Sequence, residues 1–340
     1  MIRELPRFSA LSMTLMFGAC SMPASNSMPS TVVNAPSVAV GQSISKHYLF
    51  VANLTGGSGS GFGSVTYYAP RKKTATGTIS TSSPTAMVFD RNGHLFVTNI
   101  EGYGSVSVYN PGGSSAYTIS DGVNSPLALA IDPSQNLYVA NSGDPTNSVT
   151  VYKPGTMTVW HTITSGVDYP SAMVIDRLGN LYVANGSANT VTVYKAGRTQ
   201  PWHIITLGIK SPTALVLDKS GNLYVANQSG AVTEYAFGTT KLIRSLDGSY
   251  NSPFALAIDP SGNLYVADGN GVTIFKNGEG TGWKTIGMQA TALAVDPAGT
   301  LYVAQQSHNL VTAYKLASTS QSEIITDGIN NPEALAVFPQ

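Results

Sequence analysis

The sequence predicts an all-β fold, namely a seven-bladed β-propeller of four-stranded antiparallel blades that spans residues 46–340. Three observations lead to this prediction. A short apolar motif recurs at a nearly constant spacing, each repeat divides into short strand-forming segments, and the two ends of the chain carry complementary parts of one repeat.

The repeated motif is the strongest of these signals. Its seven copies start 42, 44, 42, 41, 37 and 42 residues apart and read PTAMVFD (from Pro84), PLALAID (Pro126), PSAMVID (Pro170), PTALVLD (Pro212), PFALAID (Pro253), ATALAVD (Ala290) and PEALAVF (Pro332). A period of this length is typical of one four-stranded propeller blade.

Each repeat divides into four short segments. Between residues 170 and 211 these are SAMVID, LYVAN, TVTVYK and WHIIT, which are rich in Val, Ile, Tyr and Thr and are separated by Gly, Pro, Asn and Asp. That composition indicates strands joined by turns. No stretch of the repeats keeps an apolar face at helical spacing over three turns, so a helical repeat is excluded.

The first turn of each complete repeat carries an aspartate. In Asp259-Pro260-Ser261-Gly262-Asn263 the carboxylate is placed to accept backbone N–H groups ahead of it, while Pro260 presets φ and Gly262 allows a positive φ. Because no catalytic site needs six copies of one residue, we predict that these aspartates form turns. They are Asp90, Asp132, Asp176, Asp218, Asp259 and Asp296.

The two chain ends complete one blade. Residues 46–83 supply the second, third and fourth strands of a blade with no first strand, whereas PEALAVF at 332–338 is a first strand with nothing after it. We therefore predict that the C-terminal strand joins the N-terminal blade and closes the ring. Closure removes the exposed sheet edges that favour aggregation.

Residues 1–20 predict an export signal. Arg3 and Arg7 precede an apolar stretch over 8–17, which is too short to cross a bilayer and is typical of a signal peptide. The segment 17–20 (FGAC) resembles a bacterial lipobox, with Phe17 where Leu is usual, and this resemblance implies that Cys20, the sole cysteine, is lipidated. Plain secretion and a buried cysteine are the alternatives. Residues 21–45 are rich in Ser, Pro, Asn and Met and predict a flexible linker.

The charge pattern predicts few partners of high charge. The chain has 11% charged residues and zero net charge, and its one compact basic cluster, Arg71-Lys72-Lys73, is interpreted as a solvated turn. The sequence thus lacks the Lys/Arg stripe that nucleic acid binding requires. We expect an exported monomer that meets the membrane through its lipid anchor only, or is otherwise periplasmic or secreted.

With these motifs in hand, the chain resembles two families of propeller repeats. LYVANGSANTVTVYK, at 181–195, is similar to the YVTN repeat, and the pattern of PFALAIDPSGNLYVAD, at 253–268, is similar to the NHL repeat, although the Arg usual before the third NHL strand is Thr or Ser here. The resemblance extends loosely to virginiamycin B lyase and to gluconolactonase-type propellers. It implies a propeller fold and, for those enzymes, a metal such as Ca or Mg; no cofactor is predicted otherwise.

One face of the predicted ring carries the candidate ligand-binding residues. Loops joining second to third strands, and fourth strands to the next blade's first strand, share this face, which we call the upper face. Each second strand ends there with an amide or carboxylate side chain: Asn53, Asn99, Asn141, Asn185, Asn227, Asp268 and Gln305. This ring would suit a sugar or a peptide. The alternative is that each side chain bonds its own loop backbone.

Glu333 is a further candidate on the upper face. Its counterparts in the other repeats, Thr85, Leu127, Ser171, Thr213, Phe254 and Thr291, are uncharged. A lone carboxylate at the channel mouth would suit a divalent cation or a general base. The alternative is a solvated glutamate at a strand end.

Other chemical signals are weaker. The glycine-rich loop 54–64 lacks the lysine and helix of a phosphate-binding loop, and the five histidines are scattered. Glu101, Tyr103, Asp144 and Tyr250 on upper loops are minor ligand-contact candidates. Trp160, Trp202 and Trp283 occupy equivalent positions on the outer strands, where we predict packing between blades, with an aromatic stripe for a carbohydrate or protein as the alternative.

Two functions remain open at this stage. The first is a non-catalytic, membrane-tethered module that binds a protein, peptide or glycan through its upper face. The second is a metal-dependent lyase or lactonase, implied by the resemblance to such propellers. No catalytic residue is assigned for either.

Overall fold

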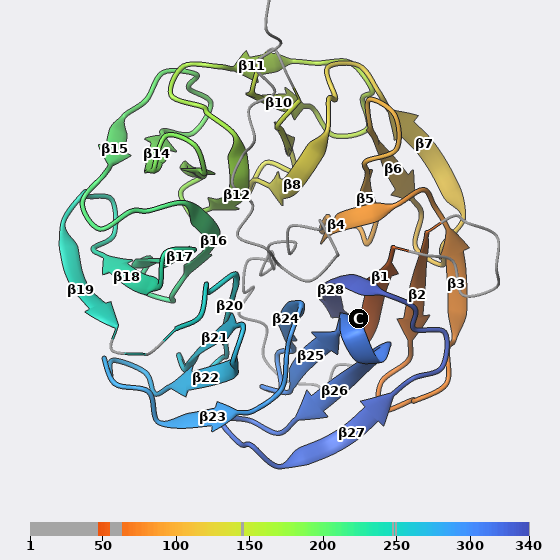
Figure 1. Cartoon of the computed structure of the whole chain (residues 1–340). Helices are drawn as coiled ribbons and strands as arrows, with labels where there is room; N and C mark the ends of the chain where they lie inside the picture. The colour runs from red at the N-terminus through yellow and green to blue at the C-terminus, as the bar shows by residue number, and fades with distance from the viewer. Residues whose placement is uncertain (1–46, 55–62, 144–145, 247, 249, 340) are drawn as a thin grey trace, which may run out of the picture.

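The protein forms a ring of seven four-stranded sheets around a central axis (Figure 1). A computed structural model describes residues 47–54, 63–143, 146–246, 248 and 250–339. The predicted signal peptide at 1–20 and linker at 21–45 lie outside these residues. The seven-bladed, all-β architecture predicted from the repeat is confirmed.

The strands fall into four sets according to their place in a blade. The first strands, innermost in the ring, are β28 (Pro332–Pro339), β4 (Pro84–Phe89), β8 (Pro126–Ile131), β12 (Pro170–Ile175), β16 (Pro212–Leu217), β20 (Ala255–Ile258) and β24 (Ala292–Val295). The second strands are β1 (His47–Asn53), β5 (Leu95–Asn99), β9 (Leu137–Asn141), β13 (Leu181–Asn185), β17 (Leu223–Asn227), β21 (Leu264–Asp268) and β25 (Leu301–Gln305). The third strands are β2 (Ser64–Tyr68), β6 (Ser105–Tyr109), β10 (Ser148–Tyr152), β14 (Thr190–Tyr194), β18 (Ala231–Tyr235), β22 (Gly271–Phe275) and β26 (Leu310–Tyr314). The outer strands are β3 (Gly77–Ser80), β7 (Ser115–Ile119), β11 (His161–Ile163), β15 (His203–Ile205), β19 (Leu242–Leu246), β23 (Lys284–Ile286) and β27 (Gln321–Ile325).

The closing blade has the predicted composition, with strand order β28-β1-β2-β3. β28 pairs antiparallel with β1 over the whole length of β1, from His47 opposite Pro339 to Asn53 opposite Pro332. The N–H of Leu54 also donates to the carbonyl of Asn331 at 3.0 Å. The two ends of the chain thus meet in one sheet, as Figure 1 shows where the blue β28 lies beside the red β1.

The core is divided into seven apolar clusters, each shared by two neighbouring blades. In one of them Ala86, Val106 and Val108 of β4–β7 pack against Leu129 and Val139 of the next blade. Another joins β24–β27 to the closing blade through Val311, Leu49 and Leu335. Since each blade is buried on both faces, no blade has a core of its own, and the ring gains stability only as a whole.

The turn-forming role predicted for the six aspartates is confirmed. Asp176 Oδ1 accepts the N–H groups of Leu178 and Asn180, both at 2.9 Å, and its Oδ2 accepts the amide of Asn180 at 2.8 Å. Each equivalent carboxylate accepts the backbone N–H four residues ahead. Its second oxygen also contacts the side chain at that position, which is His94 beside Asp90 and Asn elsewhere, except beside Asp296, where the residue is Thr300. These turns lie on the face opposite the upper face, which we call the lower face.

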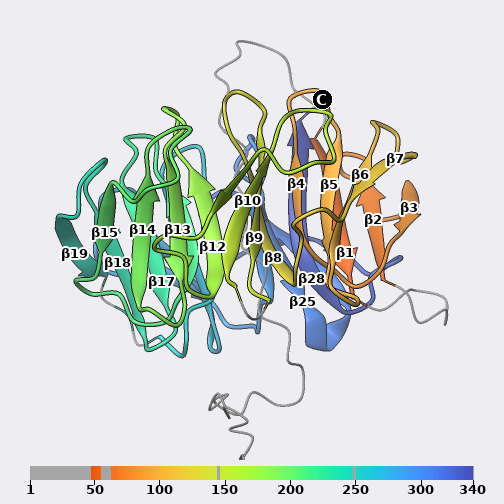
Figure 2. The ribbon, with the colours of Figure 1, turned by 90° about the horizontal axis from the view of Figure 1, so that it is seen from above.

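The lower face consists of the loops that join first to second strands and third to fourth strands. Figure 2, which views the ring at right angles to Figure 1, shows loops at both ends of the upright strands. In the described part of the chain the single helix is the short 3-10 turn η1 (Gln306–His308). None of the described segments is a helix with the length and apolar character needed to span a bilayer.

Candidate functional site

The predicted ring of amide and carboxylate groups lies at the upper ends of the second strands, but its side chains are buried. Their exposed fractions run from 0% to 5%. The members are Asn53, Asn99, Asn141, Asn185, Asn227, Asp268 and Gln305.

Asn185 illustrates what these side chains contact. Its Oδ1 accepts the N–H of Asp168 at 3.0 Å, and its Nδ2 donates to the hydroxyls of Thr190 and Thr192 at 3.0 and 2.9 Å. Asp168 belongs to the loop that brings the chain in from the preceding blade, whereas both threonines lie on the third strand. One amide therefore connects three segments of the chain.

The other ring members repeat this pattern with small changes. Asn53, Asn141 and Asn227 accept the N–H of Asn330, Asn124 and Lys210 respectively, at 2.9 to 3.0 Å. Asp268 accepts three backbone N–H groups, including that of Asn251, and Gln305 donates to Thr312. Asn99 accepts the hydroxyl of Thr81. These contacts are structural, but they run chiefly to the loop arriving from the preceding blade and to the third strand rather than to each side chain's own loop. A ligand contact of the seven side chains stays a prediction.

Glu333 is also buried, with 1% of its surface exposed, so the alternative of a solvated glutamate is wrong. It is the second residue of β28, beside the upper face, where the amide of Gln306 donates to its Oε1. Its counterparts serve a different purpose. The hydroxyls of Ser171, Thr213 and Thr291 each donate to the carbonyl of the proline that begins the next blade's motif, at 2.6 to 2.9 Å.

The upper loops differ between the two halves of the ring. The loops between second and third strands have ten, five and six residues in three adjacent blades, at 54–63, 100–104 and 142–147, against two to four residues in the other blades. Most of the glycine-rich loop, 55–62, and Asp144 lie outside the described residues. Tyr250 is partly buried against the cluster that contains Leu246 and Phe275.

Tyr103 is the most exposed large apolar side chain described, at 84%. Its backbone is nevertheless held in place, because its carbonyl accepts the N–H of Ser125 at 2.8 Å. Gly104 follows with a φ of +89°, and a Cβ there would lie 2.4 Å from Pro126 Cδ. The loop is therefore fixed at its base against the next blade, and its aromatic ring faces solvent.

The described residues contain no group of three or more His, Cys, Asp or Glu side chains arranged to hold a metal ion. His94 is paired with Asp90 at 2.7 Å in a lower turn, and His308 contacts Ser307. The donor set for the Ca or Mg ion implied by the resemblance is thus not found in the described part of the chain, and we derive no reaction step through a metal.

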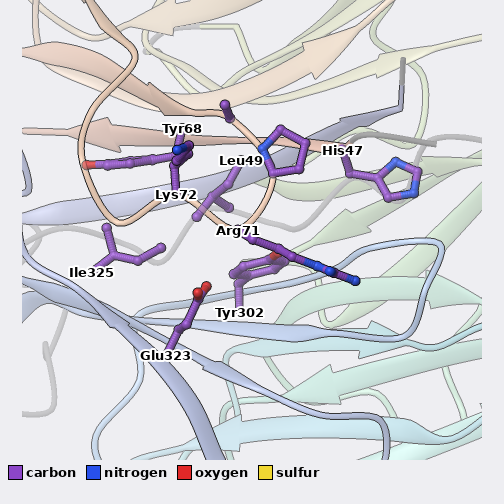
Figure 3. A pocket seen from close by; sticks show the side chains of 10 residues that line it. His47, Leu49, Tyr68, Arg71, Lys72, Tyr302, Glu323 and Ile325 are labelled. Atoms are coloured by element: carbon purple, nitrogen blue, oxygen red, sulfur yellow. The ribbon is translucent and has the colours of Figure 1, made fainter. Parts of the chain in front are cut away.

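A shallow pocket lies at the lower side of the junction between the closing blade and β24–β27. It encloses about 210 Å³ that is open to solvent, and Figure 3 shows its lining, including His47, Arg71, Lys72, Tyr302 and Glu323. This volume is below the range of most small-molecule sites. Burial and the nearby charges of Asp296 and Glu323 raise the pKa of Tyr302, so its phenol stays protonated. We regard the pocket as part of the seam between two blades.

Sequence reasoning missed one buried ion pair. Glu234 occupies a third-strand position that holds Val151, Val193 or Ile274 in other blades, and its Oε2 accepts the guanidinium Nε of Arg244 at 2.6 Å. Arg244 also donates to the carbonyl of Gly278 in the next blade at 2.8 Å. The signal available in the sequence was that Glu234 is the one charged residue at a third-strand position that is apolar in every other repeat.

Comparison with known proteins supports the fold and leaves the family open. No protein-family model matches the chain, and no curated protein matches it. Among solved structures, one from Bacteroides fragilis, described as a putative 6-phosphogluconolactonase, has a TM-score of 0.70 at 15% identity and covers 88% of this chain and 100% of its own. A protein of the same description from Bacteroides uniformis has a TM-score of 0.72 at 15% identity, covering 86% and 99%.

A third neighbour is a functionally unknown protein from Desulfotomaculum acetoxidans, with a TM-score of 0.70 at 14% identity, covering 86% of this chain and 98% of its own. At such low identities these likenesses establish a shared propeller fold and nothing finer. The resemblance to NHL and YVTN repeats therefore stays a prediction.

Proposed function

We propose that the protein is an extracytoplasmic binding module that recognises a protein, peptide or glycan with the long upper loops of three adjacent blades. The observation that carries this proposal is Tyr103, whose ring is 84% exposed while its carbonyl is fixed by the N–H of Ser125. The backbone that carries the ring is already fixed, and a tyrosine has only two side-chain rotations to lose, so little conformational entropy is lost when it meets a ligand.

The position of the long loops also supports recognition. The loops at 54–63, 100–104 and 142–147 join strands of consecutive blades, so their described ends lie on one side of the upper face. Loops of this kind on a rigid scaffold commonly carry binding residues. The ring of amide and carboxylate groups makes the scaffold rigid, because most of its side chains connect three segments of the chain, as Asn185 does.

The proposal is tested by substituting Tyr103. Ligands are selected with the full-length chain from a panel of soluble oligosaccharides and a peptide-display library, and each binder is then titrated by calorimetry. Tyr103→Ala should weaken a true ligand at least about tenfold, as truncation of an aromatic anchor does, without changing the melting temperature. Leu207→Ala, exposed on a short-loop side of the same face, is the matched control. Equal affinities for all three proteins would refute the proposal.

A lactonase is the second candidate. It is favoured by the description of two structural neighbours as putative 6-phosphogluconolactonases and by Glu333, a buried carboxylate in a ring of otherwise uncharged residues. The test is hydrolysis of 6-phosphogluconolactone and gluconolactone, with and without Ca or Mg, by the protein and by Glu333→Gln. Activity that Glu333→Gln removes, while folding is retained, would favour the enzyme. No hydrolysis above the spontaneous rate would exclude these two substrates.

The proposed location follows from the N-terminal sequence. Arg3 and Arg7 with the apolar stretch over 8–17 predict export, and Cys20 is the proposed site of lipid attachment. Metabolic labelling with a fatty-acid analogue, compared between the protein and Cys20→Ser, tests this proposal. Labelling that persists in Cys20→Ser would contradict it.

A further inference from the structure

The zero net charge of the chain conceals a strong difference between the two faces of the ring. The thirteen lower loops carry seven acidic residues and twelve basic ones, and every one of the basic side chains is exposed. The basic residues are Arg71, Lys72, Lys73, Arg91, Lys153, Arg177, Lys195, Arg198, Lys219, Lys241, Lys276 and Lys315. By contrast, the described residues of the upper loops carry one lysine, Lys210, and four carboxylates: Glu101, Asp121, Asp168 and Asp327.

The acidic side chains of the lower face do little to reduce this positive surface. Six of the seven are the turn aspartates, which point into their own turns and accept backbone N–H groups. Of the seven, only Glu279 is exposed. A mobile ion or a large anionic surface that approaches from below therefore meets a layer of ammonium and guanidinium groups.

The same face carries the three tryptophans of the chain at its rim. Trp160, Trp202 and Trp283 are each about 40% exposed, at 41%, 39% and 39%. A lysine ammonium lies over each ring, at 4.7 Å for Lys153, 4.3 Å for Lys195 and 4.5 Å for Lys276. The prediction of packing between blades is thus incomplete, because part of each indole faces solvent beside a lysine.

Exposed aliphatic side chains lie between the charges. Met157, Leu178 and Leu316 belong to three different lower loops, and each is at least 44% exposed. Tryptophan, lysine and isolated aliphatic groups are the side chains that partition together at a membrane–water boundary, where the rings sit among headgroups and the cations meet lipid phosphates.

The chain also enters the ring at this face. His47, the first residue of β1, lies in the lower pocket beside Arg71 and Lys72 (Figure 3). Cys20 precedes it by 27 positions in the sequence. The described chain thus begins on the basic side of the ring, and one lipid chain plus a basic surface is a combination that gives stable membrane association.

We propose that the lower face docks on a membrane surface that carries anionic lipid headgroups, so that the upper face points away from it. This adds a second membrane contact to the lipid anchor expected from the sequence. It uses a different surface from the proposed ligand site and stands whether or not that site is correct.

The arrangement favours a membrane over other anionic partners. The basic side chains are spread over all seven blades of the ring rather than aligned as a stripe that could follow a phosphate backbone. Stacking of a sugar on the indoles would have to displace the lysines that lie over them. A broad, flat lipid surface requires neither a groove nor free ring faces.

Tryptophan fluorescence tests this proposal directly, since all three tryptophans lie on the lower rim and residues 1–46 contain none. The full-length chain carrying Cys20→Ser is mixed with vesicles of phosphatidylcholine, alone or with about one-third phosphatidylglycerol. We expect the emission to shift to shorter wavelength with the anionic vesicles only, and the shift to disappear at high salt.

Two variants identify the contributing charges. Replacing Arg71, Lys72 and Lys73 together with glutamine should weaken binding at least about tenfold, and Lys219→Gln about fivefold, as expected for charges near an anionic membrane. Lys210→Gln is the matched control, because Lys210 and Lys219 flank the same strand, β16, on opposite faces. It should leave vesicle binding unchanged.

Three outcomes would overturn the proposal. Sedimentation with vesicles without a change in tryptophan emission would show that the apolar N-terminal stretch, and not the lower face, makes the contact. Equal shifts with neutral and anionic vesicles would exclude a charge-driven contact. Binding to a soluble polyanion such as heparin, with no binding to vesicles, would assign the face to an anionic polymer.

Discussion

Removal of one buried amide, in Asn185→Ala, should destabilise the whole protein. The change leaves the N–H of Asp168 without its acceptor at 3.0 Å and the hydroxyls of Thr190 and Thr192 without a donor. Each lost hydrogen bond contributes about 1 kcal/mol, and a buried group left unsatisfied costs about 1–3 kcal/mol. We therefore expect the free energy of unfolding to fall by about 2–4 kcal/mol.

Urea denaturation followed by circular dichroism measures this effect. The midpoint should fall while the slope of free energy against urea concentration stays unchanged, since the buried area of the native ring is the same. Ser187→Ala, an exposed residue of the same upper loop, is the matched control and should change stability by less than about 0.5 kcal/mol.

The competing interpretation makes the opposite prediction. If Asn185 serves a ligand and not the fold, Asn185→Ala should bind that ligand less tightly and unfold at the same urea concentration as the unmodified protein. A loss of stability below about 0.5 kcal/mol would refute our reasoning, because it would mean that water replaces every contact of the amide at no cost.

Two further predictions concern buried ionisable groups. Arg244→Met should lower the free energy of unfolding, measured by urea titration, by about 3–5 kcal/mol, because it leaves the carboxylate of Glu234 buried without its partner. The double variant Glu234→Val/Arg244→Met should recover most of that loss. Equal losses of stability in the single and the double variant would contradict the pairing. Burial raises the pKa of Tyr152 to about 12 from an ordinary value near 10. The unfolded chain therefore releases the phenol proton at a lower pH than the folded chain does. As a result, the free energy of unfolding falls as the pH rises from about 10 to 12. Tyr152→Phe should lose less stability across that window, by up to about 1.4 kcal/mol per pH unit, and an unchanged alkaline profile would count against the burial of the phenol.

The fold was largely predictable because the propeller repeats its pattern. The motif copies from Pro84 to Pro332 fix the number of blades, and the incomplete first and last repeats predict the pairing of β28 with β1. The turns were equally predictable, because an aspartate such as Asp259 accepts its hydrogen bonds within its own five-residue turn.

The site was harder to predict because burial depends on neighbouring blades. Asn185 and its equivalents end a strand, where sequence suggests exposure, yet the chain arriving from the preceding blade covers them. Glu333 is buried at a junction between residues far apart in the sequence, beside Gln306. Sequence distance carries no information about either contact.

The charge of the lower face was concealed for a related reason. The aspartates of the first turns cancel the lysines in any sum over the sequence, although the structure turns one set inward and the other outward. Likewise Arg71-Lys72-Lys73 appears as an isolated turn until the ring brings Arg91, Lys153 and Lys315 onto the same face.

One closed ring, completed by β28, presents two chemically different faces. Thermal unfolding of a chain that ends at Asn330 tests the closure most directly. Loss of β28 strips the partner from β1 and opens the clusters that contain Leu335 and Ala336. We predict a cooperative loss of stability throughout the ring, with a melting temperature lowered by at least about 10 °C or no folded protein. An unchanged melting temperature would contradict closure and with it the geometry of both faces.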